Sequence, residues 1–198
     1  MQHLDTETRA LLACAGAVAL GGQPALETAC RECKAAGVPS LWMDELLLQS
    51  VLIVGWPRAL NGFAEWRRLE APAAEGDEDA TVWRARGEAI CREIYGKNYT
   101  RLRENIRALH PALDGLMTTE GYGRIIGRPG LDLARRELCV VVQVALQGAE
   151  RQLHSHLLGA LNAGASAAAV SEALELAGPL LGPRELTLAM SLWERVRP

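Results

Sequence analysis

Apolar residues recur along most of the chain at the three- and four-residue spacing of helices that pack on one side. In the C-terminal part, Asp132 and Ser166 stand where helix N-caps are expected, and Gly148 and Gly164 stand where helices end. This pattern predicts four helices. They are expected over roughly residues 133–146, from Gly148 to Ala163, from Ser166 to Gly182, and from Pro183 to Trp193.

The N-terminal part shows the same punctuation. A helix is predicted to Leu20, followed by a Gly21-Gly22 turn and a second helix that Pro24 opens and Gly37 ends. A third helix is predicted to start at Pro39-Ser40 and to break at Gly55-Trp56-Pro57. When residues 9–68 are aligned without gaps with residues 136–195, eleven of the sixty pairs are identical, including three pairs of glycines. We therefore expect two tandem helical repeats that share one core, with chance similarity as the alternative.

One segment admits two interpretations. Residues 138–146 have the β-branched content of a buried strand, but their counterparts in the first repeat, residues 11–20, are rich in alanine. We predict a helix there. Residues 82–108 also show a helical pattern, with a break at Gly96, and the helix over residues 42–54 is apolar on nearly every side, which suggests burial between subunits.

These patterns predict one compact all-α domain in three parts: a degenerate first repeat over residues 1–70, an acidic linker over 71–80, and connecting helices plus a second repeat over 81–198. The linker carries four acidic residues between Glu75 and Asp79. The most apolar stretch, residues 46–56, is too short to span a bilayer, so we expect no membrane segment.

Composition narrows the function classes. Of 198 residues, 49% are hydrophobic and 23% are charged, the net charge is −3, and there is no long basic run, so we expect no nucleic-acid partner. The five cysteines are an odd number, and the N-terminus lacks a secretory pattern. We expect reduced thiols in a cytoplasmic protein.

The second repeat resembles the carboxymuconolactone decarboxylase family, within the alkylhydroperoxidase D-like superfamily. The residues that carry the resemblance are Arg128-Pro129-Gly130-Leu131, Arg136-Glu137-Leu138, Gly148, and the stretch from His156 through Gly159-Ala160-Leu161-Asn162 to Gly164. The resemblance implies an alkylhydroperoxidase D-like helical bundle, here a double-repeat member, that assembles into homo-oligomeric trimers or hexamers with a small pocket near subunit boundaries.

The resemblance also implies a site. The peroxidase branch of the superfamily uses a Glu, a Cys-x-x-Cys pair and a His, which fall here on Glu137, Ala149, Gln152 and His156. The dithiol is therefore missing at this place. The decarboxylase branch lacks those cysteines too and retains the His, so this chain resembles that branch more closely.

Glu137 and His156 are thus the candidate catalytic residues, acting as acid and base in a decarboxylation without cofactor or metal. A small carboxylated lactone or a related aromatic-degradation intermediate is the expected substrate, and Arg128, Arg135 or Arg151 can supply a cation for its carboxylates. Two further candidates for substrate binding are His154 and Asn162, each with a structural alternative: a surface position for His154 and a helix-end bond for Asn162.

Two other functions remain open. Cys30 and Cys33 lie one helical turn apart, so they are candidate redox thiols of a peroxidase or reductase, although incidental thiols fit the same spacing. The counterparts of Glu137 and His156 in the first repeat are Ala10 and Ala29. One copy of the site is therefore already absent, and an oligomeric binding protein without catalysis is the other alternative.

Overall fold

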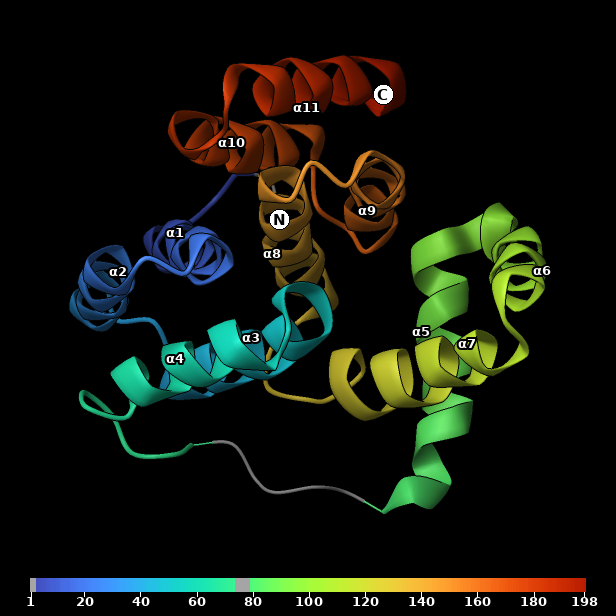
Figure 1. Cartoon of the computed structure of the whole chain (residues 1–198), viewed down its shortest axis with the longest axis horizontal. Helices are drawn as coiled ribbons and strands as arrows, with labels where there is room; N and C mark the ends of the chain where they lie inside the picture. Colours follow the sequence, from blue (N-terminus) through green and yellow to red (C-terminus); the bar gives the residue numbers. More distant parts are fainter. Residues whose placement is uncertain (1–2, 74–78) are drawn as a thin grey trace.

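The computed structural model describes residues 3–73 and 79–198, and all regular structure within these residues is helical (Figure 1). The first repeat comprises α1 (Thr6–Leu20), α2 (Gln23–Ala35), α3 (Ser40–Val54) and α4 (Trp56–Trp66). The connecting region comprises the 3₁₀ turn η1 (Ala80–Val82), α5 (Trp83–Tyr95), η2 (Gly96–Asn98), α6 (Tyr99–Leu109), α7 (Pro111–Gly115) and the π-helix η3 (Leu116–Ile126). The second repeat comprises α8 (Leu133–Leu146), α9 (Glu150–Asn162), α10 (Ala167–Ala177), the 3₁₀ turn η4 (Gly178–Leu180) and α11 (Pro183–Val196).

The two repeats are built alike at the same offset along the chain. Helices α2 and α9 each have 13 residues and are 127 positions apart. Asp5 and Asp132, also 127 positions apart, cap α1 and α8 by accepting hydrogen bonds from the backbone N–H groups three residues on. Gly21 and Gly148 both follow the first helix with a positive φ, of 75° and 63°, which a side chain would disfavour.

The core lies where α1 packs against α8. Helix α1 also contacts α10, and α8 contacts α3, so the first helix of each repeat packs on the third helix of the other. The segment 138–146 is helical, as expected, and every residue from Leu138 to Ala145 is buried. A helix at the centre of the bundle is covered on all sides, which explains why its sequence resembles a buried strand.

The connecting region packs beside the second repeat. Helix α5 lies against η3 and α9 (Figure 1). Gly87 of α5 and Gly123 of η3 allow the two backbones to touch, because a Cβ on either glycine would stand within about 2 Å of a backbone oxygen of the other element. The break at Gly96 falls as predicted between α5 and α6, whereas the helical residues 111–126 had no clear sequence signal.

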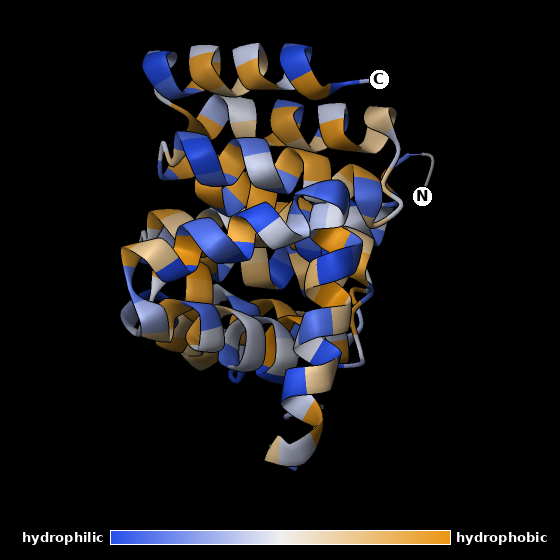
Figure 2. Cartoon of the chain, turned by 90° about the vertical axis from the view of Figure 1, so that its right-hand side faces the viewer, coloured by the Kyte–Doolittle hydropathy of each residue, from blue (hydrophilic) through white to orange (hydrophobic). Residues whose placement is uncertain are grey.

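Hydrophilic and hydrophobic residues alternate along the helices on the side of the molecule that Figure 2 shows, as amphipathic helices require. In the expected acidic linker, Asp79 caps η1 by accepting a hydrogen bond from Thr81, and the other acidic residues, Glu75, Asp77 and Glu78, lie outside the described residues. Within the described parts of the chain, no helix has the length and apolar character needed to cross a bilayer.

Candidate functional site

The central feature of the second repeat is a buried pair formed by Glu137 on α8 and His156 on α9. Nδ1 of His156 lies 2.8 Å from Oε2 of Glu137, and the residues are 9% and 1% exposed. The other carboxylate oxygen of Glu137, Oε1, is buried without a hydrogen-bond partner among the described residues. A carboxylate bound to Nδ1 orients the imidazole so that Nε2 is left for a ligand.

The local sequence explains this geometry. Asp132 starts α8 by capping Arg135 N, which places Glu137 on the second turn of a helix that is buried from Arg136 to Ala145. Gly159 provides the space on α9, because a Cβ there would lie 2.5 Å from Oε2 of Glu137 and 2.9 Å from Ile94. A buried carboxylate is costly without a partner, and the bond to His156 supplies one.

Three residues that the sequence analysis did not select surround the pair: Cys91 and Tyr95 of α5 and Tyr122 of η3. The hydroxyl groups of the two tyrosines are 2.5 Å apart, and their rings meet edge to face. Burial raises the pKa of both tyrosines well above the usual range, and the charge of Glu137 raises it further. Both are therefore neutral hydrogen-bond donors at pH 7. Each tyrosine is followed by a glycine, in Tyr95-Gly96 and Tyr122-Gly123, and this shared pattern is the sequence signal that could have marked them.

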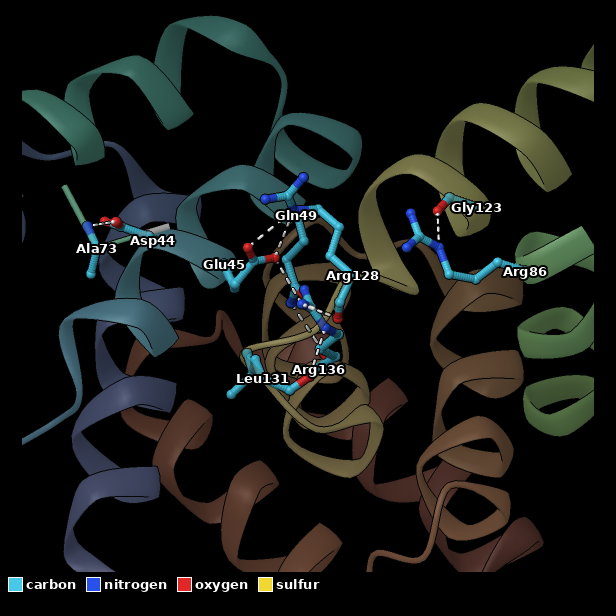
Figure 3. Close-up of polar contacts among 9 residues, drawn as sticks. All are labelled: Asp44, Glu45, Gln49, Ala73, Arg86, Gly123, Arg128, Leu131 and Arg136. Carbon is cyan, nitrogen blue, oxygen red and sulfur yellow. Dashed lines mark hydrogen bonds and ion pairs between the residues drawn. The ribbon is translucent and has the colours of Figure 1, made fainter. Parts of the chain in front are cut away.

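The candidate cation Arg128 belongs to a different cluster. Arg128 and Arg136 converge on Glu45 of α3, at 3.0 Å and 2.8 Å, and all three side chains are buried (Figure 3). Arg136 also donates to the backbone oxygens of Leu131 and Arg128, and to Gln49. Burial lowers the pKa of Arg136 from its ordinary value. This cluster joins the two repeats and holds the start of α8, on which Glu137 lies.

The other two candidate arginines also lie apart from the pair. Arg135 stacks over Trp42 at 4.2 Å and donates to Thr8, Asp132 and Asp5, which ties the N-terminal ends of α1 and α8 together. Arg151 is exposed on the first turn of α9 and lines a shallow cavity. The structure therefore does not bring the three candidate arginines together with Glu137 and His156.

His154 and Asn162, by contrast, line a larger cavity of about 770 Å³ between α5, α6 and α9. Asn162 donates from Nδ2 to the backbone oxygen of Ile94, and His154 is exposed. Neither Glu137 nor His156 is among the described residues that line this cavity. Ile94 lines it and also lies beside Gly159 and Glu137, so the pair is next to the cavity but screened from it.

Cys30 and Cys33 lie in the first repeat, away from this pair, and both are buried as free thiols. Cys33 contacts the backbone oxygen of Ala10 at 3.2 Å. A hydrogen bond with Cys14, together with burial, raises the pKa of Cys30 far above its usual range. The surroundings thus favour the unreactive thiol form. Within the described parts of the chain, no three His, Cys, Asp or Glu side chains are grouped as a metal site requires.

Comparison with known proteins supports the resemblance. The sequence model of the carboxymuconolactone decarboxylase family matches residues 2–68 and 111–195, which include both repeats and leave α5 and α6 unmatched. The chain is also similar to "Peroxisomal protein 2" of Schizosaccharomyces pombe, with 27% identity over 150 residues that cover 70% of this chain and 69% of the relative. The all-helical fold is the alkylhydroperoxidase D-like one expected for such proteins. The chain belongs to the carboxymuconolactone decarboxylase family.

Proposed function

We propose that this protein is a cofactor-free carboxy-lyase that decarboxylates a small carboxylated lactone or a related aromatic-degradation intermediate. The observation that carries the proposal is the buried 2.8 Å contact between Glu137 and His156, together with the unpartnered Oε1 of Glu137. A hydrogen-bonded acid and imidazole of this kind can exchange a proton with a bound molecule. The family match includes the positions of both residues.

The proposed step needs only one proton. The C–C bond to the carboxylate breaks, carbon dioxide leaves, and the electron pair stays on the ring carbon, where the conjugated lactone delocalises it. His156, protonated and oriented by Glu137, donates the proton from Nε2 to that carbon and recovers a proton from solvent. Of the His156 side chain, 11% is exposed, which is the side from which a substrate must approach. We propose that a ligand in the 770 Å³ cavity reaches His156 when Ile94, which lines the cavity and lies beside Gly159 and Glu137, shifts.

The test is turnover of lactones that bear carboxylates, followed by carbon dioxide release. We expect His156→Ala to lower kcat about 10²- to 10⁴-fold, the usual contribution of general acid–base catalysis, and Glu137→Gln to lower it by a smaller factor. His3→Ala is the matched control, because His3 is exposed at the N-terminus and pairs with Glu172. A kcat of His156→Ala equal to that of the wild type contradicts the proposal.

One observation favours a second candidate, an oligomeric binding protein without catalysis. The cavity has room for a ligand but does not include Glu137 or His156. If the protein binds carboxylated molecules and the wild type releases no carbon dioxide from any of them, this second function is the correct one.

We further propose that the protein is a homo-oligomer, a trimer or a hexamer. Large apolar side chains are exposed on α3 and α4, including Leu52 at 41%, Trp56 at 65% and Leu60 at 55%. Several large apolar side chains exposed on neighbouring helices are typical of subunit contacts. Light scattering coupled to gel filtration measures the subunit number, and a monomer at micromolar concentration contradicts the proposal.

The five free thiols favour a reducing compartment, and we propose that the protein lies in the cytoplasm. Cell fractionation would test this against the peroxisome, which the name of the yeast relative suggests.

A further inference from the structure

The cavity of about 770 Å³ is lined by residues of four elements, α5, η2, α6 and α9. Its lining includes Ile94 and Tyr95 at the end of α5, Lys97 of η2, Arg101 and Leu102 of α6, and His154 and Leu158 of α9. Figure 1 shows α5 standing between the ribbons of α6 and α9. A cavity of this size suits one small molecule.

The charges of the cavity have one sign. Lys97 and Arg101 line it, and no Asp or Glu is found among the described residues of its wall. Three neighbouring arginines are neutralised, since Arg92 pairs with Glu88, and Arg103 and Arg107 both pair with Asp114. For Lys97 and Arg101, no ion pair is formed within the described residues. Two unpaired cations at one cavity attract an anion.

The remaining wall is suited to an organic molecule. Leu102, Leu158 and the ring of Tyr95 provide apolar surface, while Asn98 and Asn105 add neutral polar groups. Inorganic anions make no use of apolar surface, whereas an organic acid with a hydrocarbon ring fills both kinds of wall. The chemistry of the cavity is therefore that of a carboxylate with an apolar body.

We propose that this cavity binds a small organic acid, with Lys97 and Arg101 holding its carboxylates. The idea that this acid is the molecule decarboxylated at Glu137 and His156 rests on the proposed function. Ile94 and Tyr95 both line the cavity and lie near that pair. Both cations lie between residues 69 and 110, which the family match leaves out. The connecting helices of this chain thus select the acid, and the repeats supply the acid–base pair.

The experiment is calorimetric titration of the full-length protein with isophthalate, a rigid aromatic diacid, and with isophthalamide, its neutral counterpart. We expect isophthalate to bind more tightly than isophthalamide, and more weakly at high salt. Lys97→Ala and Arg101→Ala should each raise the dissociation constant about five- to tenfold, because each removes one charge-assisted contact. Arg84→Ala is the matched control, because Arg84 is exposed on α5 and does not line the cavity. Its loss should change the dissociation constant less than twofold.

Each outcome decides the question. Equal affinity for the diacid and the diamide would overturn the inference. So would equal losses of isophthalate affinity in Arg84→Ala and Arg101→Ala, or binding of inorganic phosphate as tight as that of isophthalate. His156→Ala separates it from the proposed function. If His156→Ala binds isophthalate normally while Arg101→Ala does not, the cavity assignment stands even when no lactone is turned over. If turnover depends on His156 but the affinity for isophthalate is unchanged in Lys97→Ala and Arg101→Ala, the cavity assignment is wrong and the proposed function stands.

Discussion

The two repeats have the same helices but differ in chemistry. In each repeat, an arginine of the first helix forms an ion pair with a glutamate on the third helix of the other repeat: Arg9 with Glu172, and Arg136 with Glu45. These four positions correspond at the offset of 127 residues. Yet Ala10 and Ala29 stand where the second repeat has its acid and imidazole. The ion pairs and helix ends define the shared frame, so a repeat can keep its packing after its polar pair is gone.

The difference follows from what covers each repeat. Helix α5 lies on α9 at Gly159, where its Ile94 meets Glu137. The counterpart of Gly159 on α2 is Glu32, and Glu32 is exposed. The connecting helices therefore enclose only one of the two equivalent faces. A buried acid–base pair requires such enclosure, and this explains why the chemistry is confined to the second repeat.

The largest expected difference between the repeats concerns the two arginines. Arg136→Met leaves Glu45 buried beside Arg128 alone, and we expect a loss of about 3–5 kcal/mol in the free energy of unfolding. Arg9→Met removes an ion pair whose arginine is 47% exposed, so the loss should be under about 1 kcal/mol. Urea unfolding of both variants measures the contrast. Equal losses would mean that the two ion pairs are equivalent despite their burial.

The thiols offer the next contrast. Cys14, Cys30 and Cys33 occupy positions whose counterparts are Val141, Leu157 and Ala160, all buried, so the first repeat uses thiols as small apolar groups. We expect the five thiols of the native protein to react with a disulfide reagent at pH 8 about a hundredfold or more slowly than in denaturant.

The physical reason is clearest for the two remaining cysteines. Burial raises the pKa of Cys91 and of Cys139 to about 12, which leaves only about one thiolate in ten thousand at pH 8. A thiol count before and after hydroperoxide treatment is the check. Rapid loss of two thiols, with matching peroxide consumption, would support a thiol peroxidase that uses Cys30 and Cys33 and would refute the packing role.

The same comparison shows how far the sequence could predict the molecule. The repeat and the caps at Asp132 and Ser166 depend on local spacing, which a sequence displays. Glu137 and His156 were selected through the resemblance to a family, and their side chains lie 2.8 Å apart. The contacts of Arg128 and Arg135 do not depend on local spacing, because their partners Glu45 and Asp5 are 83 and 130 residues away along the chain. A cation near a site in sequence can thus be fully engaged elsewhere in space.

The tertiary surroundings of Tyr95 and Lys97 could not be predicted for a related reason. They belong to α5 and η2, and their role depends on how α5 packs on η3 and α9. That packing depends on backbone contact at Gly87 and Gly123, which are two glycines among 19 in the chain. Nothing in their local spacing distinguishes them, so only tertiary structure shows that this region encloses the acid–base pair.

An intermediate effect is expected where α5 covers α9. In Gly159→Ala the added methyl group meets Oε2 of Glu137 and the side chain of Ile94, so we expect a loss of about 1–3 kcal/mol, although alanine is the better helix former. Glu32→Ala, at the equivalent exposed position of α2, should change the stability by less than about 0.5 kcal/mol. Thermal unfolding gives both values. A neutral Gly159→Ala would show that α5 can move away from α9 without cost.

The smallest contrast concerns the two helix caps. Asp5→Ala and Asp132→Ala should each lose about 1 kcal/mol of unfolding free energy, because each removes a side-chain acceptor from the start of α1 or α8. Both caps also pair with Arg135, so charge can contribute to each cap beside the hydrogen bond. Asp5→Asn addresses this, since asparagine caps as well as aspartate but carries no charge for Arg135, whose guanidinium lies 2.7 Å from Asp5.

The pH dependence decides the matter. Slight burial raises the pKa of Asp5, but the hydrogen bonds from Thr8 and the charge of Arg135 outweigh it, and the net shift is downward. A carboxyl group with a lowered pKa in the folded state stabilises the protein above its unfolded pKa of about 3.9, and this contribution is lost as the pH falls through the folded pKa. The wild type should therefore be more stable than Asp5→Asn at neutral pH, and this difference in the free energy of unfolding should shrink as the pH falls below about 4. Urea unfolding at pH 7 and pH 3 measures it. An advantage of the same size at both pH values would assign the cap to hydrogen bonding alone, and the link from Arg135 to the first repeat would then contribute no stability.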